Sequence, residues 1–361
     1  MLLVLTPVAW GVEGTLGEEG QLSSAVGLDT LQSAAGAYLN GYLNTAALTG
    51  ADLGAGAGAI LNGQRAAIPG ILKGVGRSGA MLMLVALLCG LAGSVKGELG
   101  FGGLDPYRLA GAAAVCAIAV VDVNSMMSLG REALEQMKSF SALLLPTVTA
   151  ACAAAGAPAS AVARQGATLI FFDLLISLSE RFLLPLIYAY IAAVTAAAAL
   201  DNDGLRRLGG LIKGACTGLL TGLLTLFVFY LTFTGAVAGN ADVLAQKAAK
   251  TALAGMVPVV GSILSDAAET VVAGAGVLKG TVGVVGLLAV LAICLTPFLR
   301  LGLHYIAYKC AAALSATAAP GFAAGLIDAM GSAFALMVGM VGGSGVILYV
   351  ALVTSVKAVG G

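Results

Sequence analysis

Hydrophobic positions along the chain gather in long uncharged stretches that are separated by short clusters of charge. Six stretches reach or exceed the roughly 17 to 25 residues that a helix needs to cross a bilayer core: 79–95, 139–163, 182–200, 214–241, 280–299 and 329–356. The run 107–127 predicts a seventh crossing. Segment 165–181 carries internal charge, and it fits either the first half of a helix that bends near Pro185 and continues to Leu200, or a separate half-span. The pattern predicts an all-α membrane protein with about seven transmembrane helices and further amphipathic or re-entrant helices.

Composition supports this class. Hydrophobic residues make up 59% of the 361 residues and charged residues only 10%, whereas a soluble domain carries about 25% charged residues. Eighteen Lys and Arg balance 18 Asp and Glu, so no basic face is expected for a nucleic acid. The six cysteines form no CxxC pair and there is one histidine. Neither a disulfide framework nor a metal or cofactor site is therefore predicted.

The first 77 residues differ from the rest of the chain. Residues 1–20 begin with an apolar, signal-like run that is either trimmed or retained. Residues 21–77 contain acidic residues but no Lys or Arg before Arg65, which is typical of an exported region. We expect short amphipathic helices there, with an apolar face built from Leu31, Tyr38, Tyr42 and Leu43. Residues 78–361 then form the transmembrane domain.

Positive charge gives a divided prediction of topology. The cations between 206 and 213 and those between 131 and 138 indicate two loops, which the positive-inside rule places in the cytoplasm. The cations between 65 and 77 lie just before the first span, where an exported N-terminal region should not carry them. One of these two signals is misleading.

Glycines recur at helical spacing in several predicted spans. A Gly-x-x-Lys-Gly motif occurs at 70–74, 210–214 and 276–280, and the second copy continues as a ladder of glycines four apart. Because residues four apart share a helix face, such a ladder lets another backbone approach closely. That backbone belongs either to the same subunit or to another copy in a homo-oligomer. The helix-packing glycines predicted in this way are Gly210, Gly214, Gly218, Gly222, Gly339 and Gly343.

The region 236–278 is amphipathic rather than uniformly apolar. A proline and a glycine break it into two helices, and an Asp followed three residues later by a Glu fits a capping box for the second helix. The pattern predicts a hairpin that is either re-entrant or an extracytoplasmic loop, on the same side as the exported N-terminal segment. A hairpin that docks a partner or lines a conduit is the main candidate functional surface, formed by Lys247, Lys250, Pro258, Gly261, Asp266, Glu269 and Lys279.

A second charged group lies within a predicted span. Asp173 and Glu180 are seven residues apart and share a helix face, with Arg181 about 100° away. Ionisable residues inside a membrane mark a functional site, unless the segment ends there and they reach the headgroups. Enzyme motifs are weak, because the GxSG patterns at Ser78 and Ser344 lack the Ser-before-His order and position of rhomboid proteases. No enzymatic activity is predicted.

Three motifs carry a resemblance to a known family. They are Met137-Lys-Ser-Phe140 leading into ALLLP, the string LLPLIYAYI, and the sequence from Lys250 through Gly283. With these motifs the chain resembles the stage III sporulation protein AE family over about 122–312. The N-terminal region is similar only in having a signal-like start and an exported segment.

This resemblance implies a multi-pass protein in the mother-cell membrane that surrounds the forespore. It implies partners as well: other membrane proteins and ring-forming proteins of the stage III sporulation channel complex, besides membrane lipid. It implies no enzymatic activity and no cofactor. Three functions stay open: a component of a secretion-like conduit, a small-solute permease, or a scaffold that conducts nothing. A weak 112-residue offset, which relates Pro146 to Pro258 and Pro185 to Pro297, is the internal repeat that a permease would favour.

Overall fold

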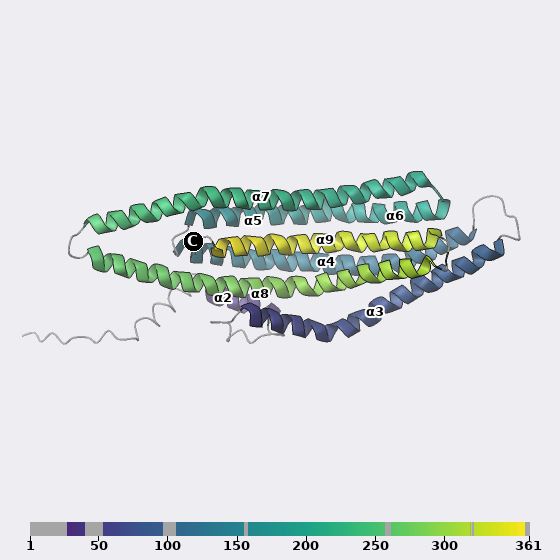
Figure 1. The fold of residues 1–361 in the computed structure, drawn as a ribbon, viewed down its shortest axis with the longest axis horizontal. Coiled ribbons are helices and arrows are strands. Elements are labelled where there is room, and N and C mark those ends of the chain that lie inside the picture. The colour runs from purple at the N-terminus through teal and green to yellow at the C-terminus, as the bar shows by residue number, and fades with distance from the viewer. Residues whose placement is uncertain are drawn as a thin grey trace, which may run out of the picture.

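The computed structural model describes residues 27–39, 53–96, 106–154, 158–256, 261–317, 319 and 321–357, and over 234–280 only the backbone. Every regular element in these ranges is helical. The elements are α2 (Leu28–Leu39), α3 (Leu53–Lys96), α4 (Pro106–Ala154), α5 (Pro158–Leu178), a π-helical turn (Ser179–Leu183), α6 (Leu184–Leu200), α7 (Asp203–Met256), α8 (Gly261–Ser315) and α9 (Gly321–Lys357). Figure 1 shows them running side by side as one elongated bundle.

The all-α membrane class predicted from the sequence is confirmed. Six helical stretches in the described part of the chain are long and apolar enough to cross a membrane, where the sequence indicated about seven. The difference arises in α4, a helix of 49 residues that joins the predicted span 107–127 to most of the predicted span 139–163 and ends at Ala154. The predicted loop between 131 and 138 is therefore wrong. Its charged residues lie on the exposed face of α4, while Leu134 and Met137 are buried.

Helices α5 and α6 settle the ambiguous segment in favour of a single long crossing. The candidate span runs from Gln165 to Leu200 without interruption. The π-helical turn joins the two helices, and the Leu184 amide donates to the carbonyl of Ser179 five residues back. Pro185 sits in the first turn of α6, where its missing N–H is tolerated. The helical backbone thus continues through this region, because Pro185 lies where no hydrogen bond from its nitrogen is needed.

The helices are much longer than a bilayer is thick. At about 1.5 Å per residue, the 49 residues of α4 extend over about 74 Å, against about 30 Å of hydrocarbon. Helices α7 and α8 are longer still, at 54 and 55 residues. Figure 1 shows both running on beyond the ends of α4, α5 and α9 at one end of the bundle. Part of the bundle must therefore stand outside the bilayer.

Helices α8 and α9 form the centre of the bundle. The most apolar part of α8 is 61% buried and that of α9 is 50% buried, against 22% for α7 and 28% for α3. Tyr308 of α8 packs on Phe334 of α9, with ring centroids 4.8 Å apart, and both side chains are fully buried. The outer helices α3 and α7 instead expose many leucines and phenylalanines, as lipid-facing helices do.

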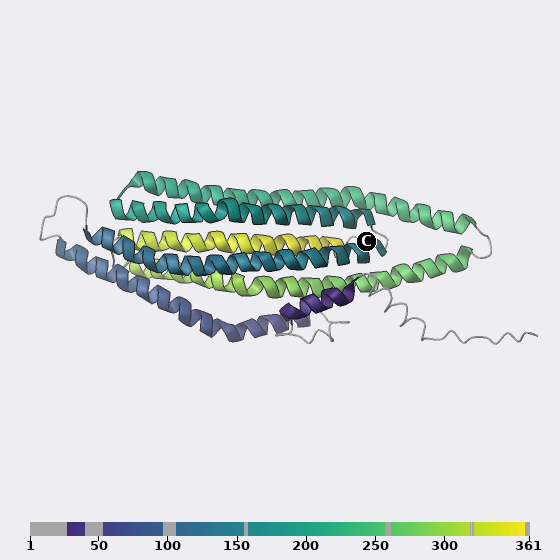
Figure 2. The same cartoon turned by 180° about the vertical axis from the view of Figure 1, so that it is seen from behind.

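The N-terminal region packs onto the bundle. Figure 2 shows α2 alongside α8, and its Leu31, Ala35 and Leu39 are fully buried. Tyr38 meets Phe140 edge to face at 5.8 Å. Predicted residues Tyr42 and Leu43 lie outside the described residues. The proposed boundary between residues 77 and 78 falls inside α3, whose first half also contacts α8 through the Gln64–Thr296 hydrogen bond of 2.7 Å.

The proposed 112-residue repeat finds little support in the helices. Pro146 lies inside α4, and Pro258, its counterpart, lies outside the described residues. Pro185 begins α6, whereas Pro297 lies inside α8. The second pair of prolines therefore occupies different positions in its two helices and gives the offset no structural support.

Candidate functional site

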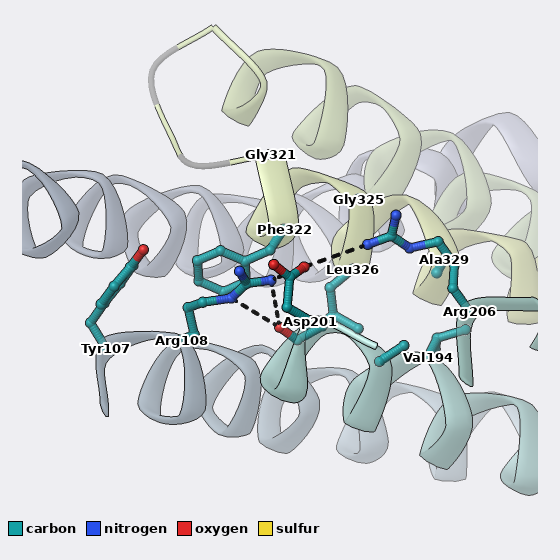
Figure 3. Close-up of a pocket in the computed structure, with 12 residues that line it drawn as sticks. Tyr107, Arg108, Val194, Asp201, Arg206, Gly321, Phe322, Gly325, Leu326 and Ala329 are labelled. Carbon is teal, nitrogen blue, oxygen red and sulfur yellow. Dashed lines mark hydrogen bonds and ion pairs between the residues drawn. The ribbon is translucent and has the colours of Figure 1, made fainter. Parts of the chain in front are cut away.

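A cavity lies where the turn between α6 and α7 meets the starts of α4 and α9 (Figure 3). It measures about 550 Å³. Arg108 of α4 extends along it, with its guanidinium carbon 5.0 Å from the centroid of the Phe322 ring. Arg108 Nη2 donates to Asp201 Oδ1 at 2.7 Å and to the carbonyl of Ala198 at 3.2 Å. This arginine ties α4, α6 and α9 together, and its Nε and Nη2 donors are engaged by Ala198 and Asp201.

The turn itself is shaped by two neighbouring residues. Asp201 ends α6 in the left-handed conformation, with φ of 52°, which Asp and Asn tolerate better than most residues. Asn202 Oδ1 accepts a hydrogen bond from the Leu205 amide at 3.1 Å and so caps the start of α7. The hydrogen bond and charge of Arg108 hold the pKa of the Asp201 carboxyl below its usual range. The ion pair therefore persists through the neutral range and is lost only on strong acidification.

A polar cluster lies between the apolar helices α3, α4 and α8. Asp122 of α4 accepts from Ser78 of α3 at 3.1 Å and from Tyr308 of α8 at 2.7 Å. Ser78, Asp122, Arg300 and His304 line one cavity of about 340 Å³. Both carboxylate oxygens of Asp122 thus have a donor from a different helix. Such a cluster fixes how α3, α4 and α8 are placed against one another.

The cluster contains Ser, His and Asp, but not in a hydrolase arrangement. Ser78 donates to Asp122, and His304 Nδ1 bonds to the carbonyl of Arg300 at 2.8 Å. Ser344, in the other GxSG pattern, donates to the Met340 carbonyl. A nucleophilic serine needs a base within hydrogen-bond reach, and these serines use their hydroxyls within helices or on Asp122.

The hydroxyl of Tyr308 can be tested as a structural donor. We expect Tyr308→Phe to lower stability by about 1–3 kcal/mol, because it leaves one half-buried carboxylate oxygen without its partner. The measurement is the thermal unfolding midpoint of the purified protein in detergent. Tyr349→Phe, at a tyrosine that is 49% exposed, is the control. Equal midpoints for the two variants would show that the Asp122 contact does not stabilise the bundle.

The glycine ladder does not pack against the described part of the subunit. A Cβ added at Gly210, Gly214, Gly218 or Gly222 meets nothing within 4 Å there. Among the described helices, packing within the same chain, one of the two alternatives, is therefore wrong for the ladder on α7. In α9, a Cβ added at Gly339 would lie 3.5 Å from Leu220 Cδ1 of α7. A Cβ added at Gly343 meets nothing within 4 Å in the described residues.

The charged group on α5 lies on the surface. Asp173 pairs with Lys138 of α4 at 3.3 Å, and both side chains are more than half exposed. Glu180 and Arg181 lie in the π-helical turn and are exposed. The helix continues past them, so they do not mark its end. The structure brings none of these three residues to the Asp122 cluster or to the Arg108 cavity.

The predicted hairpin corresponds to the end of α7 and the beginning of α8. Helix α7 ends at Met256 and α8 begins at Gly261; Pro258 lies outside the described residues, as do the side chains of Lys247, Lys250 and Lys279. Asp266 and Glu269 follow the start of α8 by five and eight residues. The predicted capping box is therefore wrong, because the two acidic residues occupy the helix interior rather than its first position.

These features define a polytopic helical membrane protein with a partly buried polar cluster and two helices that extend beyond its other long helices at one end. A family model described as stage III sporulation protein AE matches residues 78–359, and the chain belongs to that family. The stage III sporulation protein AE of Bacillus subtilis (strain 168) is 29% identical over 184 residues, covering 51% of this chain and 46% of that protein. The aligned part is thus about half of each protein. No solved structure matches.

Proposed function

We propose that this chain is a membrane component of a secretion-like channel between mother cell and forespore. Family membership carries the role in sporulation. The structural observation that supports the channel role is the extension of α7 and α8 beyond the other helices (Figure 1). We call the ends of α7 and α8 that extend beyond the other helices the arm. A protein that only moves a solute across one bilayer has no need of it, whereas a component that joins partners outside the bilayer does.

The length of the arm can be estimated from the helices. The uncharged stretch of α7 ends before Asp242, and that of α8 begins after Lys279. The remaining 15 residues of α7 (242–256) and 19 residues of α8 (261–279) correspond to about 22–29 Å of helix at 1.5 Å per residue. Two antiparallel helices of this length offer ring-forming partners a docking surface. We place Lys247, Lys250, Asp266, Glu269 and Lys279 on that surface.

The decisive experiment is genetic and biochemical. A spore-forming host that lacks this chain is expected to complete engulfment, to lose late forespore gene expression, and to regain heat-resistant spores when the chain is supplied. After gentle extraction, the protein is expected to run as a large assembly with its partners. Normal sporulation without the chain would refute the role. A monomer that catalyses solute uptake in vesicles would instead favour a permease.

The exposed glycine ladder gives this assembly a specific contact. We expect Gly218→Leu to leave the monomer folded, because a side chain there meets nothing within 4 Å, and to disrupt assembly, because small residues allow helices of different subunits to approach. Size-exclusion chromatography in mild detergent measures the size of the assembly. If Gly218→Leu assembles as the parent does, the ladder faces lipid.

A further inference from the structure

A groove between α7 and α9 opens on the surface of the bundle and measures about 390 Å³. Lys213 and Thr225 of α7 and Ser332 and Ile347 of α9 mark its two ends. The thirteen residues from Lys213 to Thr225 rise by about 18 Å along the helix axis.

The two ends of the groove differ in chemistry. At one end Lys213 Nζ donates to Ser332 Oγ at 3.1 Å, and no carboxylate in the described residues pairs with this ammonium. The nearby Asp328 is held by Lys309 at 2.6 Å. From Gly214 onward α7 carries no charge until residue 242. Lys213 therefore lies at the boundary between the charged start of α7 and its apolar part, where an ammonium reaches the lipid headgroups.

The rest of the groove is apolar. Leu220, Leu224 and Val346 form its walls, and Gly343 leaves space that no side chain fills. The hydroxyls of Thr217 and Thr225 donate to carbonyls one turn back in α7. They are therefore engaged within the helix, and a ligand gains little from them.

We propose that this groove binds one acyl chain of an anionic phospholipid, with the phosphate against Lys213, since the Ser332 hydroxyl already donates to the Asp328 carbonyl. The apolar walls suit a hydrocarbon chain, the length suits one leaflet, and the cation without a carboxylate partner at the membrane boundary complements an anionic headgroup. The site is separate from the projecting ends of α7 and α8, and it does not depend on the channel role.

Native mass spectrometry tests the site directly. The purified protein is placed in nanodiscs of equal phosphatidylglycerol and phosphatidylcholine, released, and weighed with its retained lipid. The parent is expected to keep phosphatidylglycerol in preference to phosphatidylcholine. Lys213→Gln should reduce that preference about tenfold, since it removes one charge-assisted contact while keeping a donor for Ser332. Gly343→Leu should abolish retention of both lipids by filling the apolar part.

Two matched variants control for charge and volume. Arg131→Gln removes an exposed cation from α4, and Gly302→Leu adds the same side chain at a glycine with nothing within 4 Å. Both should retain lipid as the parent does, and all four variants should show similar unfolding midpoints. Unchanged retention in Gly343→Leu, or equal retention of both lipids by the parent, overturns the proposal. A smaller assembly with unchanged lipid in Gly343→Leu would assign the groove to a protein helix instead.

Discussion

Substituting Gly286→Leu is expected to destabilise the bundle by about 3 kcal/mol, at the upper end of the range for overpacked cores. Gly286 lies in the buried part of α8, and a Cβ placed there comes within 2.6 Å of Leu144 in α4 and 3.0 Å of Leu352 in α9. A leucine adds three more carbons in the same direction. Three central helices would have to separate, so we expect a large loss of folded protein in the membrane and a lower unfolding midpoint.

The control lies sixteen residues further along the same helix. Gly302→Leu introduces the same side chain where nothing lies within 4 Å, and it should change stability by less than about 0.5 kcal/mol. Membrane abundance and thermal unfolding in detergent compare the two variants. Similar values for both would mean that α4, α8 and α9 pack less closely than the structure shows.

Asp266→Ala combined with Glu269→Ala is expected to reduce heat-resistant spores by several orders of magnitude without reducing protein abundance. Both residues lie inside α8, three apart and therefore on one face. Alanine is a better helix former than either residue, so the helix should persist. The loss then reflects the missing carboxylates on the arm, which we expect to meet a cationic partner. Spore counts and immunoblots of the membrane fraction measure the two effects.

The matched control is Glu132→Ala with Glu135→Ala. This pair has the same spacing and is exposed on α4. Asp201 and Asp203 are unsuitable for the purpose, because they pair with Arg108 and Arg206. Equal sporulation of both double variants would make the arm a spacer. Degradation of the first variant would give its carboxylates a structural role.

Hydropathy predicted most of the spans but not how they join. The residues between 131 and 138 carry enough charge to interrupt an apolar run, and hydropathy therefore predicts a loop there. In α4 the charged side chains face outward while Leu134 and Met137 face the core. Charge ends a hydropathy stretch, but it does not end a helix whose buried face stays apolar.

The sites depended on contacts that no local spacing reveals. The ladder on α7 is conspicuous because its glycines repeat, yet a Cβ added to any of them meets nothing within 4 Å in the described part of the chain. Gly56 and Gly286 belong to no such ladder, yet a Cβ added to them would lie 2.6 Å from Leu288 and Leu144, respectively. Asp122 likewise meets residues 44 and 186 positions away. Its position near the end of an apolar run was the available signal, and the sequence alone did not supply its partners.

The π-helical turn at Ser179–Leu183 has a consequence for comparing sequences. Its bond from the Leu184 amide to the Ser179 carbonyl spans five residues where an α-helix spans four, so the turn holds one surplus residue. A helical wheel drawn in one frame through 158–200 therefore misplaces every residue after the turn by about 100°. The two helices need separate wheels, each with its own phase. Deleting one residue within the turn leaves the buried faces of both helices intact. Deleting one residue later in α6 instead rotates the residues that follow it by about 100° relative to the buried face.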